Sequence, residues 1–328
     1  MSDRLPFPRM PALALAGAVA AAAAVPLVAG SYVQYLASLA LINGIAAIGL
    51  TILTGQAGQV SLCSSSFMAV GAYAVVWLTG PAALPFWGAL PLAGLAAAVF
   101  GLVVGLPALR VRGYYLAVVT LGFLEITQIL IESFPAVTGG VRGVSAVRPA
   151  LSSGVRLGDA PFFHLTLAVT VLMTLLALTL VRSPLGSAMR AVHASERVAA
   201  TLGFAVGPTK LAAFAVAAFY AGIAGGLFAP LVGFVDPLEF GLLTSIQHII
   251  FAVFGGIGSI AGALFGAAVL SVLPEGLRDL KEYMELIYSV LLLLSLLLMP
   301  SGVAGLPARL RRPADPPRAA GRAVPARS

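Results

Sequence analysis

Long runs of residues without a charge limit what this chain can fold into. The hydrocarbon core of a bilayer is about 30 Å thick and takes roughly 20 apolar residues of α-helix to cross. Uncharged runs of about this length or longer are 12–30, 33–54, 58–79, 84–106, 163–181, 211–232, 241–274 and 286–304. A soluble protein could not bury so many such helices. The chain is therefore predicted to be a multi-pass membrane protein.

The composition supports this prediction and excludes other classes. Hydrophobic residues make up 60% of the 328 residues and charged residues 9%, whereas a soluble domain has about 25% charged residues. The single cysteine, Cys63, cannot form an intramolecular disulfide. The sequence has no Gly-Lys-Ser/Thr triplet of a P-loop, no HExxH motif and no Cys/His cluster. We expect no catalytic residues, no metal site and no bound cofactor, and transport is the default function.

The chain divides into ten apolar segments. Residues 114–135 form a further span that contains two glutamates. The run 241–274 is too long for one crossing, and glycines in its middle divide it into 241–256 and 258–274. These glycines are Gly255, Gly256 and Gly258. We predict an all-α fold of about ten transmembrane or half-membrane helices, in a single domain over residues 1–306.

The basic residues predict the orientation. With ten segments both termini lie on one side, and the positive-inside rule places the side richer in Lys and Arg in the cytoplasm. Five of the 19 basic residues then lie outside: Arg142, Arg148, Arg156, Arg278 and Lys281. Both termini are thus predicted to be cytoplasmic. The net charge of +7 reflects this topology rather than nucleic-acid binding.

The two ends of the sequence need separate interpretations. Arg4 and Arg9 precede the apolar run 12–30, as in a signal peptide, but the run exceeds the usual core of 7–15 residues. An uncleaved first helix is the preferred interpretation. Residues 307–328 are rich in Pro, Arg and Ala without apolar periodicity, which predicts a disordered, basic cytoplasmic tail that contacts lipid headgroups at most.

The segment 183–203 carries helix signals outside the predicted spans. Ser183 can cap a helix with Pro184 in its first turn, and Ser195 can cap a second short helix that Gly203 ends. The Gly-Pro pair that follows is expected to separate this loop from the next span. Small residues on an exposed helix suit docking into a groove of another protein. A helix that rests on lipid headgroups is the alternative.

A polar stripe interrupts the span 114–135. Glu125, Gln128 and Glu132 lie at positions i, i+3 and i+7, on one face of a helix. A charged side chain that faces lipid at the centre of a helix costs about 2.5 kcal/mol or more, so the stripe is predicted to face protein or water. Glu125 either lines a solute path or holds the pore helices in register. An equal alternative is that it caps backbone groups or pairs with a buried donor.

Glycines mark one helix break in each half of the chain. The first break contains Gly55 and Gly58, and the second contains the three glycines of the run 241–274. Broken segments in corresponding positions of two halves point to a translocation site. Polar side chains next to the first break are therefore predicted to line the path: Gln56, Gln59, Ser61, Ser64, Ser65 and Ser66. The alternative is that small residues only let helices pack closely.

Several blocks of the sequence resemble the permease subunits of binding-protein-dependent ABC importers, and in particular the branched-chain amino acid permease family. They are LTGQAGQVSL (53–62), FMAVGAY (67–73), RVRGYYLAVVTLGFLEI (110–126), TGG (138–140), SPLGSAMRAVHASERVAATLG (183–203), FGGIGSIAGALFGA (254–267) and MPSGVAGL (299–306). Their order and spacing match the family across most of the chain. The chain looks most like the second of the two permease subunits that pair in such a transporter.

The resemblance implies a multi-subunit importer in a bacterial inner membrane. Its other parts would be a second permease, two cytoplasmic ATPases that bind ATP and Mg²⁺, and a periplasmic solute-binding protein. The segment 183–203 would be the coupling loop that contacts the ATPases, with Ser183, Pro184, Gly186, Arg190, Ala191, Glu196, Arg197 and Gly203. The block Thr138, Gly139 and Gly140 would belong to the path. The implied solutes are branched-chain or other amino acids.

Two alternatives remain beside this interpretation, a permease for urea or short-chain amides in the same family and an ion-coupled secondary transporter. The sequence also departs from the family in two places. Ser64 stands where the family usually has His, within Ser-Leu-Cys-Ser-Ser-Ser-Phe (61–67), and Arg142 stands where an acidic or amide residue is common. Both departures weaken the transfer of a substrate from the family to this chain.

Overall fold

The described part of the chain is mostly helical, as predicted. The computed structural model describes residues 30–111, 113–149 and 156–276 continuously, together with a few single positions toward either end. In these ranges the strands are β1 (Val144–Ser145) and β2 (Phe234–Val235), which pair antiparallel with Val144 opposite Val235. The all-α prediction therefore misses one two-residue ladder.

Eight of the predicted segments fall within the described ranges, and each contains a helix. These helices are α3 (Ser31–Thr51), continued by the π-helical turn η1 (Ile52–Gln56), α4 (Ser64–Thr79), α5 (Phe86–Ala108), α6 (Tyr114–Ser133), α8 (Asp159–Arg182), α11 (Val206–Val232), α12 (Leu242–Gly255) and α13 (Ile260–Gly276). Shorter connecting elements are α7 (Pro135–Thr138), η2 (Gly140–Arg142), α9 (Pro184–Ala194), α10 (Glu196–Thr201) and η3 (Pro237–Phe240). The segments 12–30 and 286–304 and the tail 307–328 lie outside the continuously described residues.

Five of these helices are long and apolar enough to cross a membrane: α3 with η1, α5, α6, α8 and α11. The helices α4, α12 and α13 are also apolar but shorter, as expected for segments next to helix breaks. The split of 241–274 into two segments is confirmed by α12 and α13. The count of ten segments and the cytoplasmic termini stay predictions.

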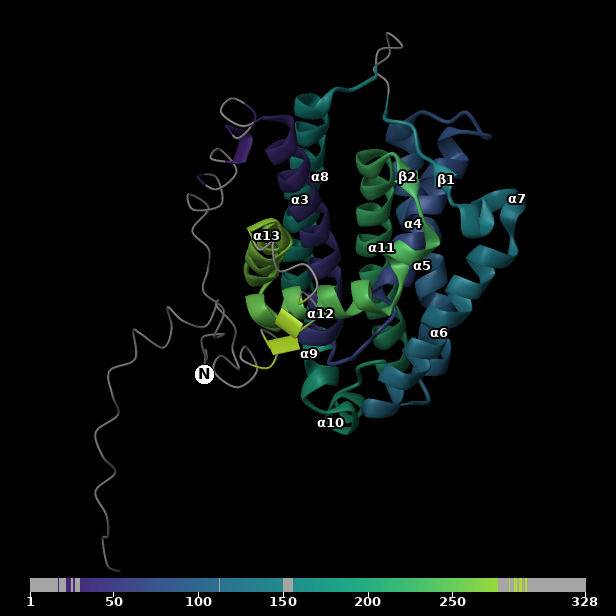
Figure 1. Ribbon diagram of the computed structural model, residues 1–328. Helices are drawn as coiled ribbons and strands as arrows, with labels where there is room; N and C mark the ends of the chain where they lie inside the picture. The colour runs from purple at the N-terminus through teal and green to yellow at the C-terminus, as the bar shows by residue number, and fades with distance from the viewer. Residues whose placement is uncertain are drawn as a thin grey trace, which may run out of the picture.

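α11 runs through the middle of the bundle (Figure 1). It lies between α3 and α8 on one side and α4 and α5 on the other, and α12 crosses the bundle at a steep angle. α9 and α10 lie at one end of the bundle, with α7 and the β1–β2 ladder toward the other. Within their most apolar windows, α3 and α11 are 72% buried and α6 is 28% buried. α6 is therefore the span with the largest face open to a partner or to lipid.

Small residues bring α4 and α11 into backbone contact. A Cβ atom added at Gly225 of α11 would lie 1.9 Å from the carbonyl oxygen of Met68 in α4. Gly222 precedes Gly225 by one turn of α11. A Cβ atom on Gly71 of α4 would lie 2.0 Å from the carbonyl oxygen of Gly222. Close approach through small residues is how helices associate where apolar burial gives no preference for protein over lipid.

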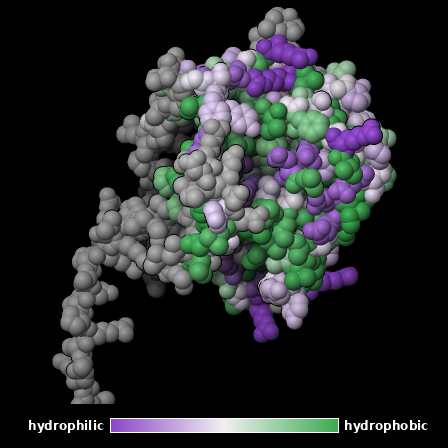
Figure 2. All heavy atoms as spheres, in the orientation of Figure 1, coloured by the Kyte–Doolittle hydropathy of each residue, from purple (hydrophilic) through white to green (hydrophobic). Residues whose placement is uncertain are grey.

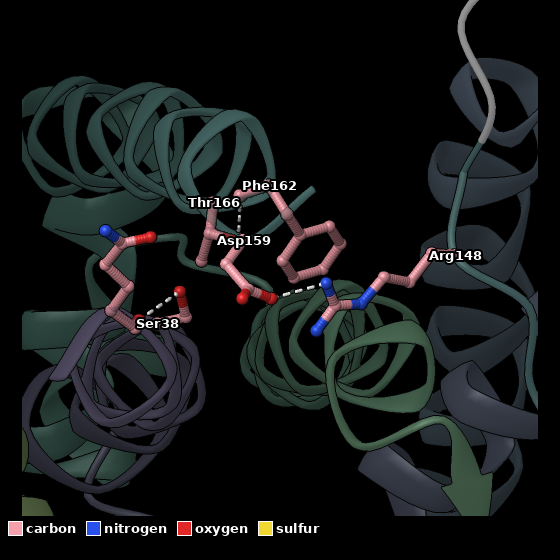
Figure 3. Close-up of polar contacts among 6 residues, drawn as sticks. Ser38, Arg148, Asp159, Phe162 and Thr166 are labelled. Carbon is pink, nitrogen blue, oxygen red and sulfur yellow. Dashed lines mark hydrogen bonds and ion pairs between the residues drawn. The ribbon is translucent and has the colours of Figure 1, made fainter. Parts of the chain in front are cut away.

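The end of the bundle opposite α9 is fastened by an ion pair (Figure 3). Arg148, in the segment after β1, donates from Nη1 to Oδ1 of Asp159 at 2.5 Å, and its guanidinium carbon lies 5.9 Å from the ring centre of Phe162. Between α3 and α8, the hydroxyls of Ser38 and Thr166 donate to carbonyls four residues earlier in their own helices. These two hydroxyls are thus satisfied within their own helices.

The structure corrects two expected helix starts. α4 begins at Ser64 rather than near 58, because residues 57–63 are not helical. α11 begins at Val206, so Gly207 and Pro208 belong to its first turn and do not separate it from the loop. A proline is accommodated there since the first turn needs no intrahelical N–H. Gly203, with φ of +85°, ends the preceding helix as expected.

The contact at Gly225 predicts a sharp difference between two glycines of α11. Gly225→Ala should lower the free energy of unfolding by about 2 kcal/mol or more, because the backbones of α4 and α11 must move apart. Gly207→Ala is the matched control, since a Cβ atom there would meet nothing within 4 Å. It should raise stability by up to about 1 kcal/mol. Thermal unfolding in detergent measures both, and equal melting temperatures for the two variants would contradict the packing.

Candidate functional site

The two predicted helix breaks lie against each other. Gln56 donates from Nε2 to the carbonyl oxygen of Gly258 at 3.1 Å. A Cβ atom on Gly55 would lie 2.4 Å from both N and Cα of Gly258, so only glycine allows this approach. Gly58, Gly256 and Gly258 have φ values of +67°, +115° and +92°, which glycine adopts without steric cost. Segments about 200 residues apart thus form one irregular centre.

Serines at the start of α4 meet α12 next to this centre. Ser64 Oγ lies 3.1 Å from Nδ1 of His248, which is fully buried. Ser65 Oγ lies 2.7 Å from Oγ of Ser245 and donates to the carbonyl of Gly241 at 3.0 Å. Ser245 was not predicted to be part of the site, and His248 was not assigned to the path. A Ser and a His on one face of the predicted segment 241–256 were the available signal.

The segment 57–63 leads from the turn η1 to α4 and is hydrogen-bonded to α6. The N–H of Leu62 donates to Oγ1 of Thr120 in α6 at 2.9 Å. Ser61 Oγ lies 3.1 Å from Sγ of Cys63, and Gln59 donates from Nε2 to the carbonyl of Ala57. Both predicted path residues of this segment, Gln59 and Ser61, are therefore buried with partners inside the segment itself.

Beyond Ser65, a narrow crevice separates α4, α6 and η3. Its walls are Ser66, Ala69, Leu124, Thr127, Gln128, Ile131, Pro237 and Phe240. The hydroxyl of Ser66 is buried and has no hydrogen-bond partner among the described residues, nor does Oε1 of Gln56. In η3, burial raises the pKa of the Glu239 carboxyl above its usual range, and the nearby Asp236 carboxylate raises it further. The walls of the crevice thus contain both polar and aliphatic side chains.

Of the predicted polar stripe of α6, Glu125 lies on the outer face of the subunit, whereas Gln128 lines the crevice. Glu125 is exposed, and Gln128 and Glu132 are partly buried. Hydrophilic side chains interrupt the hydrophobic surface over α6 (Figure 2). Gly122, one turn before Glu125, has open space where a side chain would project. The stripe is predicted to face protein or water, and the described part of this subunit does not cover it at Glu125.

The block Thr138–Gly140 forms a turn at the far end of α6. Thr138 donates from Oγ1 to the carbonyls of Ile131 and Phe134, and Gly139 and Gly140 have positive φ values. This turn does not meet the two helix breaks, which lie lower in the bundle (Figure 1). Its assignment to the solute path stays a prediction.

A larger hollow than this crevice lies elsewhere in the described surface, between α5, α8 and α11. It measures about 540 Å³ and has no charged side chain in its walls, which are mainly Ala98, Leu176, Leu180, Val216 and Phe219. The polar residues of the predicted path are not part of it. We therefore do not assign it to the path.

The predicted coupling loop forms the two expected helices. The hydroxyl of Ser183 accepts from the N–H of Gly186 at 3.3 Å to cap α9, and Ser195 accepts from the N–H of Val198 at 3.4 Å to cap α10. Pro184 occupies the first position of α9. These short polar residues satisfy N–H groups that the first turn of a helix leaves free.

Two residues expected at the ATPase contact also act inside the subunit. Arg190 donates from Nη1 to the carbonyl of Val181 at 2.6 Å and from Nη2 to Oγ of Ser187, which ties α9 to α8. Glu196 pairs with Nζ of Lys210 at 2.6 Å, which ties α10 to α11. The Lys210 side chain is only 3% exposed.

The outward surface at α10 is formed by residues other than Arg190 and Glu196. Val198 and Leu202 lie four positions apart and are 56% and 69% exposed, and Arg197 next to them is also exposed. Ala199 faces the bundle and is buried. Ala191 is partly buried. The loop thus presents two large apolar side chains and a basic one away from the bundle.

Among the described residues, no group of three His, Cys, Asp or Glu side chains could hold a metal ion.

Comparison with known proteins identifies the family. The model of the family described as "Branched-chain amino acid transport system / permease component" matches residues 32–299. LivM of Salmonella typhimurium, a high-affinity branched-chain amino acid transport system permease protein, is 35% identical over 292 residues, which cover 82% of this chain and 69% of LivM. LivM of Escherichia coli is 36% identical over the same shares of both chains.

More distant similarities point the same way. LivH of Salmonella typhimurium, another high-affinity branched-chain amino acid permease protein, is 31% identical over 55% of this chain and 61% of LivH. No solved structure matches the chain. The match to the family model extends over both helix breaks and the loop 183–203. The chain therefore belongs to the family of branched-chain amino acid transport system permease components.

Proposed function

We propose that this chain is one of two permease subunits in an ABC importer of a bacterial inner membrane. A second permease pairs with it in the membrane, two cytoplasmic ATPases bind α9 and α10, and a periplasmic binding protein delivers the solute. ATP and Mg²⁺ bind to the ATPases and not to this chain. The chain itself is a transport subunit without catalytic residues.

The observation that carries this proposal is the construction of the loop 183–203. Its two helices are fixed to α8 through Arg190 and to α11 through the Glu196–Lys210 pair, so the loop is a firm attachment point on the bundle. Its free surface carries Val198 and Leu202. The centre of a protein interface is more apolar than the rest of a protein surface, and Arg is enriched there. A lipid-resting helix needs a longer apolar face than these two residues provide.

The proposed mechanism is alternating access. Closure of the two ATPases around ATP moves α9 and α10, and the motion of the attached helices changes the side of the membrane to which the central path opens. The path runs past the helix breaks and the serines of α4. Its lining consists of hydroxyl, amide and imidazole groups with aliphatic walls, so solute is held weakly and selectivity resides mainly in the binding protein.

The proposed solute is a branched-chain or another amino acid. The names of LivM and LivH support it. LsrC of Enterobacter sp. (strain 638), an autoinducer 2 import system permease protein, is 34% identical over 56% of this chain and 52% of LsrC. Solutes therefore differ among similar proteins. Urea and short-chain amides stay the alternative for this chain.

The second permease is proposed to cover the outer face of α6. A carboxylate in the middle of a span costs several kcal/mol against lipid, and Glu125 is uncovered in this subunit. Gly122 beside it offers room for close approach of a partner helix. Two copies of this chain would bring two Glu125 carboxylates together, which favours a different permease with a donor group at this place.

Docking of the ATPases predicts different effects for substitutions at the exposed pair Val198 and Leu202 and at the Glu196–Lys210 ion pair. Val198→Asp with Leu202→Asp should abolish co-purification of the ATPases with the tagged chain, because two charges would replace the apolar contact. The melting temperature of the chain alone should not change, since both side chains are exposed. Glu196→Gln should lower that melting temperature, because it leaves the buried Lys210 ammonium without its carboxylate. Retention of the ATPases by the double Asp variant contradicts the docking surface.

The pairing through α6 predicts protection of one engineered cysteine. Gly122→Cys should react with a maleimide when the chain is purified alone in detergent, and at least about tenfold more slowly once the second permease covers it. Native Cys63 is fully buried, so background labelling should be low. Val99→Cys on α5, where valine is 61% exposed, is the control and should react equally in both samples. Equal labelling of Gly122→Cys with and without the second permease rejects this interface.

A further inference from the structure

His193 of α9 makes a contact that differs from the other attachments of the loop. Its Nδ1 lies 3.1 Å from the carbonyl oxygen of Gly55, in the π-helical turn η1 at the end of α3. Its ring also lies against Gly58, where an added Cβ atom would be 2.7 Å from Cδ2 and 3.0 Å from Cγ. One side chain therefore touches both glycines of the first helix break, by hydrogen bond and by ring packing.

The same stretch of backbone touches the second helix break. Gln56 donates to the carbonyl of Gly258, and Gly55 packs against the backbone of Gly258. Between the His193 ring and the connection from α12 to α13 there is thus a single layer of backbone. A displacement of His193 against this layer must be taken up by both breaks, because there is no space at Gly55 to absorb it.

The other anchors of the loop lead to continuous helices. Arg190 holds α9 to the end of α8, and Glu196 holds α10 to the first turn of α11. Neither reaches a break. Glycine adopts many backbone conformations without steric cost, so glycine-rich backbone changes its path at low cost. A contact to the breaks therefore has a different consequence from a contact to a regular helix.

We propose that His193 is a positioning residue that transmits the motion of the coupling loop to the paired helix breaks. Its Nδ1–H donates to the Gly55 carbonyl, and its ring holds the backbone at Gly58 in place. When α9 moves with the ATPases, His193 moves the first break, and the Gln56–Gly258 contact carries this to the second. The inference rests on the proposed function, because it requires ATPases that move the loop.

Three substitutions separate the parts of this contact. His193→Ala removes both the donor and the ring. His193→Asn keeps an N–H donor near the position of Nδ1, and His193→Phe keeps a ring that can face Gly58. His164→Ala is the matched control, since His164 is also exposed and its Nδ1 lies 2.8 Å from a carbonyl, that of Ala160 in its own helix.

The decisive measurement is solute uptake per ATP hydrolysed by the complete importer in liposomes. For His193→Ala we expect an intact complex that still hydrolyses ATP, and a ratio about fivefold or more below that of the wild type. His193→Asn should recover part of the ratio, and His164→Ala should leave it unchanged. A wild-type ratio in His193→Ala overturns the proposal. Loss of the ATPases from that variant also overturns it, because His193 would then be a docking residue.

A second measurement does not depend on the ATPases. Hydrogen exchange of the full chain alone in detergent should be faster in peptides covering 55–63 for His193→Ala than for the wild type, with α13 as a reference. If exchange in 55–63 is unchanged, the contact is rejected. If the wild type exchanges as expected but never co-purifies with ATPases, the proposed function fails and the transmission role is rejected with it, while the contact stands.

Discussion

Unwound backbone in an apolar bundle has to find polar partners within the protein, and the rest of this structure depends on how it does so. Irregular segments at membrane depth are tolerated only when they pack in protein or line a cavity. Here the first break supplies Gln56 as a donor and the second supplies the carbonyl of Gly258. Because the two breaks meet, the start of α4 lies close to α12, and the Ser64–His248 and Ser65–Ser245 contacts follow. The polar centre is therefore a consequence of the hydrogen bonds that the unwound backbone requires.

The parts of the fold that depend on local signals were predictable. Uncharged runs gave the spans, glycines divided 241–274, and Ser183 and Ser195 marked the starts of two helices that the structure contains. Each of these signals acts within about one helical turn. The errors also have local causes. Gly207 and Pro208 read as a separator, yet a proline fits the first turn of α11, and residues 57–63 are apolar enough to resemble helix although their hydrogen bonds go to α6 and to themselves.

The contacts of the candidate site were not predictable in the same way. Ser64 and His248 are 184 positions apart, and Gln56 and Gly258 are 202 apart. No local pattern specifies such pairs. Glu196 shows a subtler limit, since family resemblance assigned it to a partner protein and the structure gives it Lys210 as an intramolecular partner. A lysine at the start of a span, 14 positions after a lone glutamate in the loop, was the signal available.

The departure at Ser64 changes which side chains border the proposed path. Where the family usually has His on α4, this chain has a hydroxyl that faces the imidazole of His248 on α12, so an imidazole still borders the centre but comes from the other half of the chain. No formal charge lies among these residues. The buried hydroxyl of Ser66 and the Oε1 atom of Gln56 lack partners among the described residues, and such groups cost about 1–3 kcal/mol each while they stay unpaired. Any state that lets water or solute reach them recovers that free energy. The centre is therefore built from neutral groups, two of which gain a hydrogen bond when water or solute reaches them, as the proposed path for a passing solute requires.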